Sequence, residues 1–219
     1  MDIVYEDNHL IIVNKSAGEL SQSDYTRDLS LLDKVKNYIK TKYKKPGNVY
    51  LGLVNRLDRP TSGLVIFSKT SKSLARMNKL LKERKIKKIY NAITEKSPNP
   101  KKGTLINFLK KNQIKNKSFI VNENELKSKK AILHYTLIKK LKKFFLIEIM
   151  LETGRHHQIR SQLANIGCVI KGDVKYGAKG ANKDKSICLH AKNIEFIHPI
   201  TKAKISLDAN PPKSNIWSN

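Results

Sequence analysis

The sequence predicts an α+β fold, and three observations carry that prediction. Short apolar runs are typical of strands, while other segments repeat apolar residues at helical spacing. The two kinds of element do not alternate strictly, as they would in a doubly wound protein. Strand-forming runs near both ends of the chain also lie close enough in sequence to form hairpins.

The N-terminal segment predicts a hairpin followed by a helix. Residues 3–13 contain two strand-forming runs around the turn signal Asp7-Asn8. Ser30 and Asp33 have the spacing of a capping box, which marks a helix start, and Pro46-Gly47 marks its end. The apolar residues at helical spacing between these signals are Leu32, Val35, Ile39 and Tyr43.

The middle of the chain predicts two buried strands that enclose a polar loop. The strands are expected at residues 51–54 and 64–67, and the loop at residues 55–63 contains Pro and Gly. A helix around residues 74–81 and a strand at residues 86–94 follow from the same kind of pattern.

The second half of the chain is patterned only in part. Residues 96–130 are rich in Lys and Asn, and their pattern is weak. Residues 145–151 alternate as a strand, and a closing hairpin around Pro199 is expected at residues 196–207. Between them, Gly167 has the position of a helix C′ residue. The helix it ends repeats Ile159, Leu163 and Ile166.

The chain is strongly basic. Its 219 residues contain 44 Lys and Arg against 18 Asp and Glu, which is a net charge of +26. Such a charge concentrates polyanions, and the lysine-rich stretches are spread along patterned segments instead of forming one tail. We therefore expect a nucleic acid as partner. Ordinary solvated faces of a lysine-rich composition are the alternative that charge alone leaves open.

Nothing in the sequence indicates a membrane or an oxidising compartment. No apolar stretch approaches the ~20 residues of a membrane span, and the start of the chain lacks the regions of a secretory signal. Cys168 and Cys188 have no CxxC or CxxH neighbour, so we expect two reduced thiols in the core. We expect a cytoplasmic protein that binds no membrane.

The loop at residues 55–63 carries the densest chemical signal. It places one carboxylate, Asp58, between Arg56 and Arg59. A cationic neighbourhood favours the ionised carboxylate. A carboxylate repels phosphate, so its presence suits chemistry on a base or sugar better than simple affinity for RNA. The alternative interpretation is that Asp58 caps the turn before Pro60.

The second chemical signal is the segment from Glu152 to Arg160, which follows a strand and runs into a helix. Adjacent helical residues point about 100° apart, so His156 and His157 make a poor pair of metal ligands. No Cys, Asp or Glu stands at ligand spacing to complete a tetrahedral set. We therefore expect no metal.

Five segments of the chain resemble motifs of the RluA-type RNA pseudouridine synthases, in that family's order. They are Glu6-Asp7 through Gly18, Asn55 through Leu64, Thr153 through Arg160, Gly172-Asp173 with Tyr176-Gly177, and Leu189-His190-Ala191 with His198 through Thr201. Three positions depart from the family's usual residues: Ser16 stands for Pro, Asn55 for His and His156 for Thr.

The resemblance implies a mixed, largely antiparallel central sheet in two lobes, with flanking helices and a central cleft. It implies a single catalytic domain over residues 1–219 that acts on structured RNA, either rRNA or tRNA, without a cofactor. The family's pattern starts near residue 3, so we expect no additional N-terminal RNA-binding domain and a cationic surface that supplies the affinity. We expect a monomer.

The resemblance also implies roles for four residues. Asp58 matches the family's essential catalytic aspartate, and Arg160 matches the arginine that pairs with it. Tyr90 matches the tyrosine that stacks on the uracil and whose hydroxyl serves late proton removal at C5. Arg56 matches the arginine that fills the gap left by the flipped uridine.

Two other functions remain as alternatives. A non-catalytic RNA-binding or ribosome-assembly factor could keep the fold, and the departures at Asn55 and Ser16 favour it slightly. A nuclease or metal hydrolase that uses the histidines is a weaker alternative. For the segment at residues 96–130, the sequence leaves open a role in RNA choice or a flexible excursion.

Overall fold

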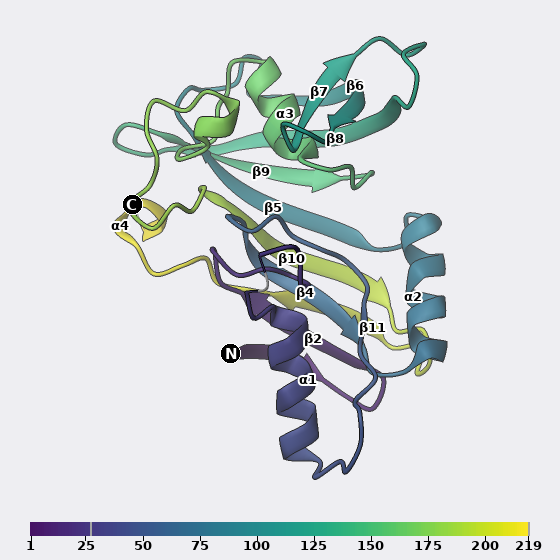
Figure 1. The fold of residues 1–219 in the computed structure, drawn as a ribbon. Coiled ribbons are helices and arrows are strands. Elements are labelled where there is room, and N and C mark those ends of the chain that lie inside the picture. The colour runs from purple at the N-terminus through teal and green to yellow at the C-terminus, as the bar shows by residue number, and fades with distance from the viewer. Residues whose placement is uncertain (27, 219) are drawn as a thin grey trace. The chain divides into compact units, whose positions relative to one another are not determined.

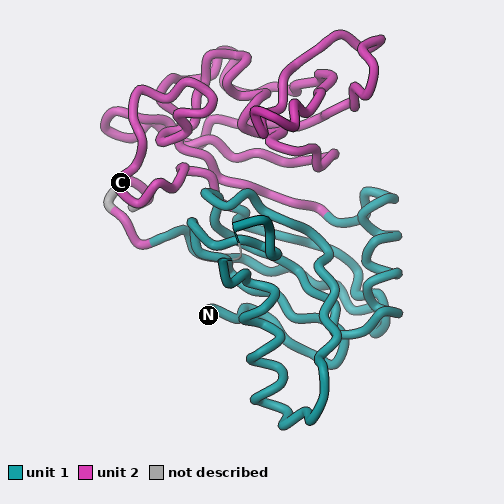
Figure 2. Tube along the Cα trace, in the orientation of Figure 1, with its two compact units in different colours: residues 1–86, 191–212 teal, residues 87–190, 213–219 magenta. Residues whose placement is uncertain are grey.

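The computed structural model describes residues 1–26 and 28–218, with the elements labelled in Figure 1. The chain forms two compact units, shown in Figure 2. The first unit contains residues 1–86 and 191–212, and the second contains residues 87–190 and the tail from residue 213. Helices and mostly antiparallel strands are mixed in the chain, which confirms the predicted α+β class.

The sheet of the first unit has the strand order β1-β2-β4-β10, with β3 beside β4 and β11 beside β10. Its strands are β1 (Asp2–Glu6), β2 (Leu10–Lys15), β3 (Gly52–Leu53), β4 (Ser62–Ser68), β10 (Leu189–Ile197) and β11 (Lys204–Asp208). The first two residues of β10 belong to the second unit. The pairs β1/β2 and β10/β11 are antiparallel, which confirms both predicted hairpins. β2 and β4 are also antiparallel, with Lys15 opposite Gly63.

The core of the first unit forms around β2 and β4, because both strands are buried on both faces. Helix α2 (Ser71–Lys82) adds Met77 to this core. The cluster also includes Leu10, Ile12, Val54, Leu64, Ile66, Ile86, Ile194, Phe196 and Ala209. Continuous burial explains why these strands read as unbroken apolar runs in the sequence.

Helix α1 (Leu31–Lys42) begins where the capping box predicts. The Ser30 hydroxyl accepts from the Asp33 backbone N–H, and the Asp33 carboxylate accepts from that of Ser30. The predicted apolar stripe is wrong at both ends, because Leu32 is only half-buried and Tyr43 is an exposed C-cap. The residues that face the core are Leu31, Val35 and Ile39, each four positions apart.

The sheet of the second unit has the order β5-β9-β8-β6-β7, and every neighbouring pair in it is antiparallel. Its strands are β5 (Lys87–Thr94), β6 (Lys102–Asn112), β7 (Lys117–Val121), β8 (Lys129–Lys140) and β9 (Phe145–Leu151). The unit also contains helix α3 (Gln158–Asn165), the 3-10 turn η1 (Val174–Tyr176) and the short helix α4 (Asn215–Ser218). As predicted, Gly167 follows α3 with a positive φ of 76°.

Residues 96–130, whose sequence pattern is weak, contain β6, β7 and the start of β8. β7 lies at the end of the sheet order, and much of β6 is exposed, so neither strand shows a strong apolar alternation. β6 is stabilised by hydrogen bonding to β8, a strand distant in sequence, as in the pairing of Leu105 with Leu133, whereas β7 pairs with the neighbouring β6 in a hairpin. Short-range pattern does not reveal such pairing.

Both cysteines are buried and reduced, as predicted. Burial raises the pKa of each thiol, which keeps Cys168 and Cys188 protonated and unreactive at neutral pH. Across the described part of the chain, no helix has both the length and the apolar content that spanning a membrane requires.

Candidate active site

Asp58 lies in the loop between β3 and β4 of the first unit, and its side chain is half-buried. Its backbone carbonyl accepts a hydrogen bond from the Thr61 N–H at 3.0 Å, which closes a turn around Arg59-Pro60. The main chain of Asp58 therefore contributes to the turn that the sequence predicts before Pro60.

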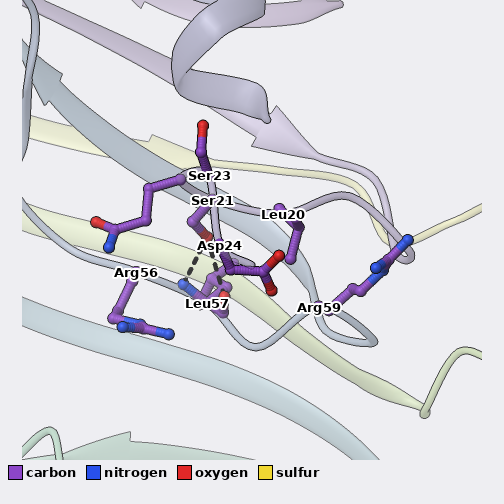
Figure 3. Close-up of a pocket in the computed structure, with 8 residues that line it drawn as sticks. Leu20, Ser21, Ser23, Asp24, Arg56, Leu57 and Arg59 are labelled. Atoms are coloured by element: carbon purple, nitrogen blue, oxygen red, sulfur yellow. Dashed lines mark hydrogen bonds between the residues drawn. The ribbon is translucent and has the colours of Figure 1, made fainter. Parts of the chain in front are cut away.

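Three contacts with residues 15–21 hold this loop. The backbone N–H of Gly18 donates to the Arg59 carbonyl at 2.8 Å, and the Arg59 Nε donates back to the Gly18 carbonyl at 3.0 Å. The buried Ser21 hydroxyl donates to the Leu57 carbonyl at 2.9 Å and accepts from the Leu57 N–H at 3.0 Å, as the dashed lines in Figure 3 show. Both neighbours of Asp58 in the chain are thus anchored by the same segment.

The third contact is made by Lys15, whose side chain is 1% exposed. Its ammonium donates to the carbonyls of Ser16, Glu19 and Arg59 at 2.9, 2.9 and 3.2 Å. Burial lowers the pKa of Lys15 to about 8, although the negative charges of Glu19 and Asp58 favour the ammonium. Lys15 is therefore a buried cation close enough to Asp58 for the two charges to interact.

The loop begins at Asn55, where the family motif usually has His. The Asn55 side chain accepts from the Ile66 N–H at 2.8 Å and donates to the Leu64 carbonyl at 3.3 Å. The Val54 N–H donates to the Ile66 carbonyl, as in the pairing of β3 with β4. The Asn55 side chain extends this hydrogen bonding by one residue beyond the backbone. The departure from the family residue therefore leaves the start of the loop well anchored.

A pocket lies beside the loop in the first unit (Figure 3). It is lined by Leu20, Ser21, Gln22, Ser23, Asp24, Arg56, Leu57 and Arg59. The exposed Arg56 side chain and the partly exposed Arg59 extend from either side of Leu57. Arg59 also pairs with Asp28 at 2.7 Å, which leaves Arg56 as the more adaptable of the two cations.

Tyr90 and Arg160 lie in the second unit. Tyr90 is on β5 opposite Ile149 and is 8% exposed. Lys88 shares its face of the strand, because successive strand residues alternate between faces. Lys88 is half-buried, and burial lowers its pKa. The role of Tyr90 as a stacking surface stays a prediction.

Arg160 is 5% exposed on α3 and is held by an ion pair within its own unit. Its Nε and Nη2 donate to the two carboxylate oxygens of Asp173 at 2.7 and 2.8 Å. Asp173 itself is 1% exposed, so this bidentate pair is shielded from water. The pairing of Arg160 with Asp58 stays a prediction, since they belong to different units.

The turn before α3 is closed by Gln158. The carbonyl oxygen of its side chain accepts from the Thr153 hydroxyl at 2.8 Å and from the Arg155 N–H at 2.9 Å. His156 and His157 stack with ring centroids 3.8 Å apart. Among the described residues, no three His, Cys, Asp or Glu side chains gather as metal ligands would.

Similarity to a known protein family assigns this chain and its Asp58 loop to that family. The model of a family described as RNA pseudouridylate synthase matches residues 9–165. The chain belongs to this family. The match includes the Asp58 loop, Tyr90 and Arg160.

Relatives in this family are similar over nearly the whole chain. The ribosomal large subunit pseudouridine synthase C of Buchnera aphidicola subsp. Baizongia pistaciae is 36% identical, over 94% of this chain and 66% of the relative. The synthase of the same name from Rickettsia prowazekii is 37% identical, over 96% of this chain and 68% of the relative. The chain thus spans about two thirds of the length of these curated relatives.

A solved structure of human RNA Pseudouridylate Synthase Domain Containing 4 has the same fold. Its TM-score is 0.81 at 21% identity, over 99% of this chain and 91% of the human chain. The structure shows two buried charged residues to which the sequence motifs assign no role. They are Lys15 and Asp173. No signal in the sequence marks Lys15 as buried, because its burial arises only when its segment and the Asp58 loop fold together.

Proposed function

We propose that this chain isomerises uridine to pseudouridine in structured RNA, with Asp58 as the catalytic residue. Family membership supports the reaction class, and the observation that carries the site is the anchoring of the Asp58 loop by Lys15, Gly18 and Ser21. A loop held at both neighbours of one carboxylate is pre-organised for chemistry at that carboxylate.

The reaction moves a bond within one nucleotide. The N1–C1′ bond breaks, the uracil rotates, a C5–C1′ bond forms, and the proton on C5 leaves while N1 gains one. A carboxylate can attack or deprotonate the sugar or add to the pyrimidine, and each route needs it ionised. The positive charge of Lys15 beside Asp58 favours that state.

The other predicted residues complete this proposal. Tyr90 stacks on the flipped uracil and takes part in the loss of the C5 proton. Arg160 pairs with Asp58 and fixes the direction of its carboxylate. Arg56, which is exposed at the rim of the pocket, takes the place of the flipped base in the RNA.

We propose large-subunit ribosomal RNA as the first substrate to test, because similar relatives carry that substrate in their names. Unmodified transcripts of large-subunit rRNA and of tRNA, labelled with tritium at uracil C5, would be incubated with the protein. Tritium release and mapping of pseudouridine should then identify one or a few uridines in rRNA. Product only in tRNA would correct the substrate, and RNA binding without product would favour the non-catalytic alternative.

The activity should decline as the pH rises through about 8, because deprotonated Lys15 has only two N–H bonds for its three carbonyl acceptors and holds the Asp58 loop less firmly. The pKa of Lys15 in the folded chain lies below its ordinary value of 10.5, so the unfolded chain binds the extra proton between about 8 and 10.5. The contribution of Lys15 to the free energy of unfolding therefore rises across this window. A loss of folding stability caused by Lys15 therefore does not explain the expected decline in activity.

Lys15→Met is the variant that checks this assignment. It should be slower at every pH and lack the decline near pH 8, and its free energy of unfolding should fall by about 1–3 kcal/mol as the carbonyls lose their donor. Initial rates at saturating RNA would be measured between about pH 6.5 and 9.5, beside urea unfolding. A variant that keeps the wild-type pH profile would show that another group titrates.

Binding of RNA should depend steeply on salt, because the net charge of +26 acts through phosphate contacts. With roughly six such contacts, affinity should fall by about 10³ between 50 and 200 mM salt. Filter binding of a transcript across this range measures the slope. An affinity independent of salt would contradict a cationic interface.

A further inference from the structure

The buried guanidinium of Arg160 has a second partner whose protonation state the structure determines. Besides the bidentate pair with Asp173, Nη1 of Arg160 lies 2.9 Å from Nε2 of His157. An arginine can only donate hydrogen bonds, so Nε2 of His157 must accept. The His157 ring is therefore neutral and carries its proton on Nδ1.

The proton on Nδ1 of His157 points to a second acceptor. Nδ1 lies 3.0 Å from the Tyr176 hydroxyl oxygen, which also accepts from the Ser118 N–H at 2.9 Å. The hydroxyl in turn donates to the Ser118 carbonyl at 3.1 Å. A hydroxyl can accept two bonds and donate one, so this chain of bonds runs in one direction from Arg160 to β7.

Packing holds the same groups in place. The Tyr176 ring lies under the Arg160 guanidinium, with 5.1 Å between the guanidinium carbon and the ring centroid. His156 stacks on His157, and its Nδ1 lies 2.8 Å from the Ser118 hydroxyl. His157 has a positive φ of 50°, an unfavourable conformation for a residue other than glycine.

We propose that His157 and Tyr176 are positioning residues, which orient the Arg160 guanidinium for the isomerisation. The inference rests on the proposed function, because it takes Arg160 to be the partner of Asp58. Asp173 holds one edge of the guanidinium and His157 holds Nη1, so together they determine its plane. Tyr176 acts one step further away, because its hydroxyl keeps the proton of His157 on Nδ1.

Three variants separate this role from a general contribution to stability. His157→Leu removes the acceptor for Arg160 and should lower kcat by about 10²-fold, with KM within about threefold, because a misdirected group costs rate. His157→Gln keeps an acceptor and should recover at least about tenfold of that loss. Tyr176→Phe keeps the ring and should lower kcat by about tenfold or less.

The matched control is His134→Leu. His134 is also hydrogen-bonded within the second unit, to Thr104 at 2.8 Å and Glu152 at 2.7 Å. Its loss should leave kcat within about twofold, and urea unfolding of all variants would show which remain folded. The proposal is overturned if His157→Leu raises only KM, or if glutamine restores no more activity than leucine.

A spectroscopic arm keeps this test independent of turnover. Long-range ¹⁵N–¹H spectra of histidine-labelled protein at neutral pH should show His157 with a protonated Nδ1 and a bare Nε2. A cationic His157, or one protonated on Nε2, would contradict the hydrogen-bond chain even in an active protein. A wild type that forms no pseudouridine but shows the Nδ1–H form would contradict the proposed function. It would still agree with the series of hydrogen bonds from Arg160 to Ser118.

Discussion

Asp58→Asn should abolish pseudouridine formation while the protein stays folded and binds RNA. Asparagine has nearly the same shape as aspartate but can act neither as the nucleophile nor as the base, so the rate should fall by at least about 10³-fold. The turn itself should survive, because Thr61 bonds to the backbone carbonyl of Asp58. Tritium release from labelled RNA and filter binding would be measured on the same preparation.

Asp28→Asn is the control for this experiment. Asp28 is a half-exposed carboxylate that pairs with Arg59 of the same loop at 2.7 Å. Exposed ion pairs contribute little, so its loss should change the rate by no more than about threefold. Full activity of Asp58→Asn would remove Asp58 from the mechanism. Loss of RNA binding in that variant would mean that the residue supports the interface instead.

Gly63→Ala should destabilise the first unit severely. Gly63 lies on β4 with a φ of 116°, a conformation that side chains rarely adopt. A Cβ atom there would lie 2.3 Å from the carbonyl oxygen of Ala191, a backbone atom that cannot move aside. Backbone strain and this overlap together should lower the free energy of unfolding by roughly 2–6 kcal/mol, measured by urea denaturation.

Gly18→Ala isolates the backbone part of this effect. Gly18 also has a positive φ, of 89°, but a Cβ atom there would meet nothing within 4 Å. Its replacement should cost only about 1–2 kcal/mol. If the two variants lost similar stability, close approach to Ala191 would not be the reason for glycine at position 63.

Elements that depend on neighbours in sequence were predicted well. The start of α1 at the Ser30 capping box and the hairpins at both ends of the chain follow from spacing over a few residues. The error at Leu32 arose because apolar residues stand at both positions 31 and 32, and only packing selects which of them is buried. Strand β6 was missed because its partner β8 is distant in sequence, and β7 was missed because its own residues show no strong apolar alternation.

The candidate site also contains residues that the sequence identifies and contacts that only the structure shows. The roles of Asp58, Tyr90, Arg160 and Arg56 were predicted from the resemblance of their motifs to those of the family. Motifs did not reveal that Lys15 is buried, or that Asp173 and His157 both hold Arg160. The burial of Lys15 and the pairing with Asp173 depend on contacts between segments that are far apart in the chain. The role of His157 depends on which nitrogen of its ring accepts a hydrogen bond.

The sequence by itself determined the α+β class, the family and the carboxylate proposed for the chemistry, because short-range spacing and residue type are legible along a chain. Only the tertiary structure decided which charges are withdrawn from water and which groups compensate them. Lys15 shows the physical reason, since its pKa and its three carbonyl partners arise when two separate segments fold together and exclude solvent.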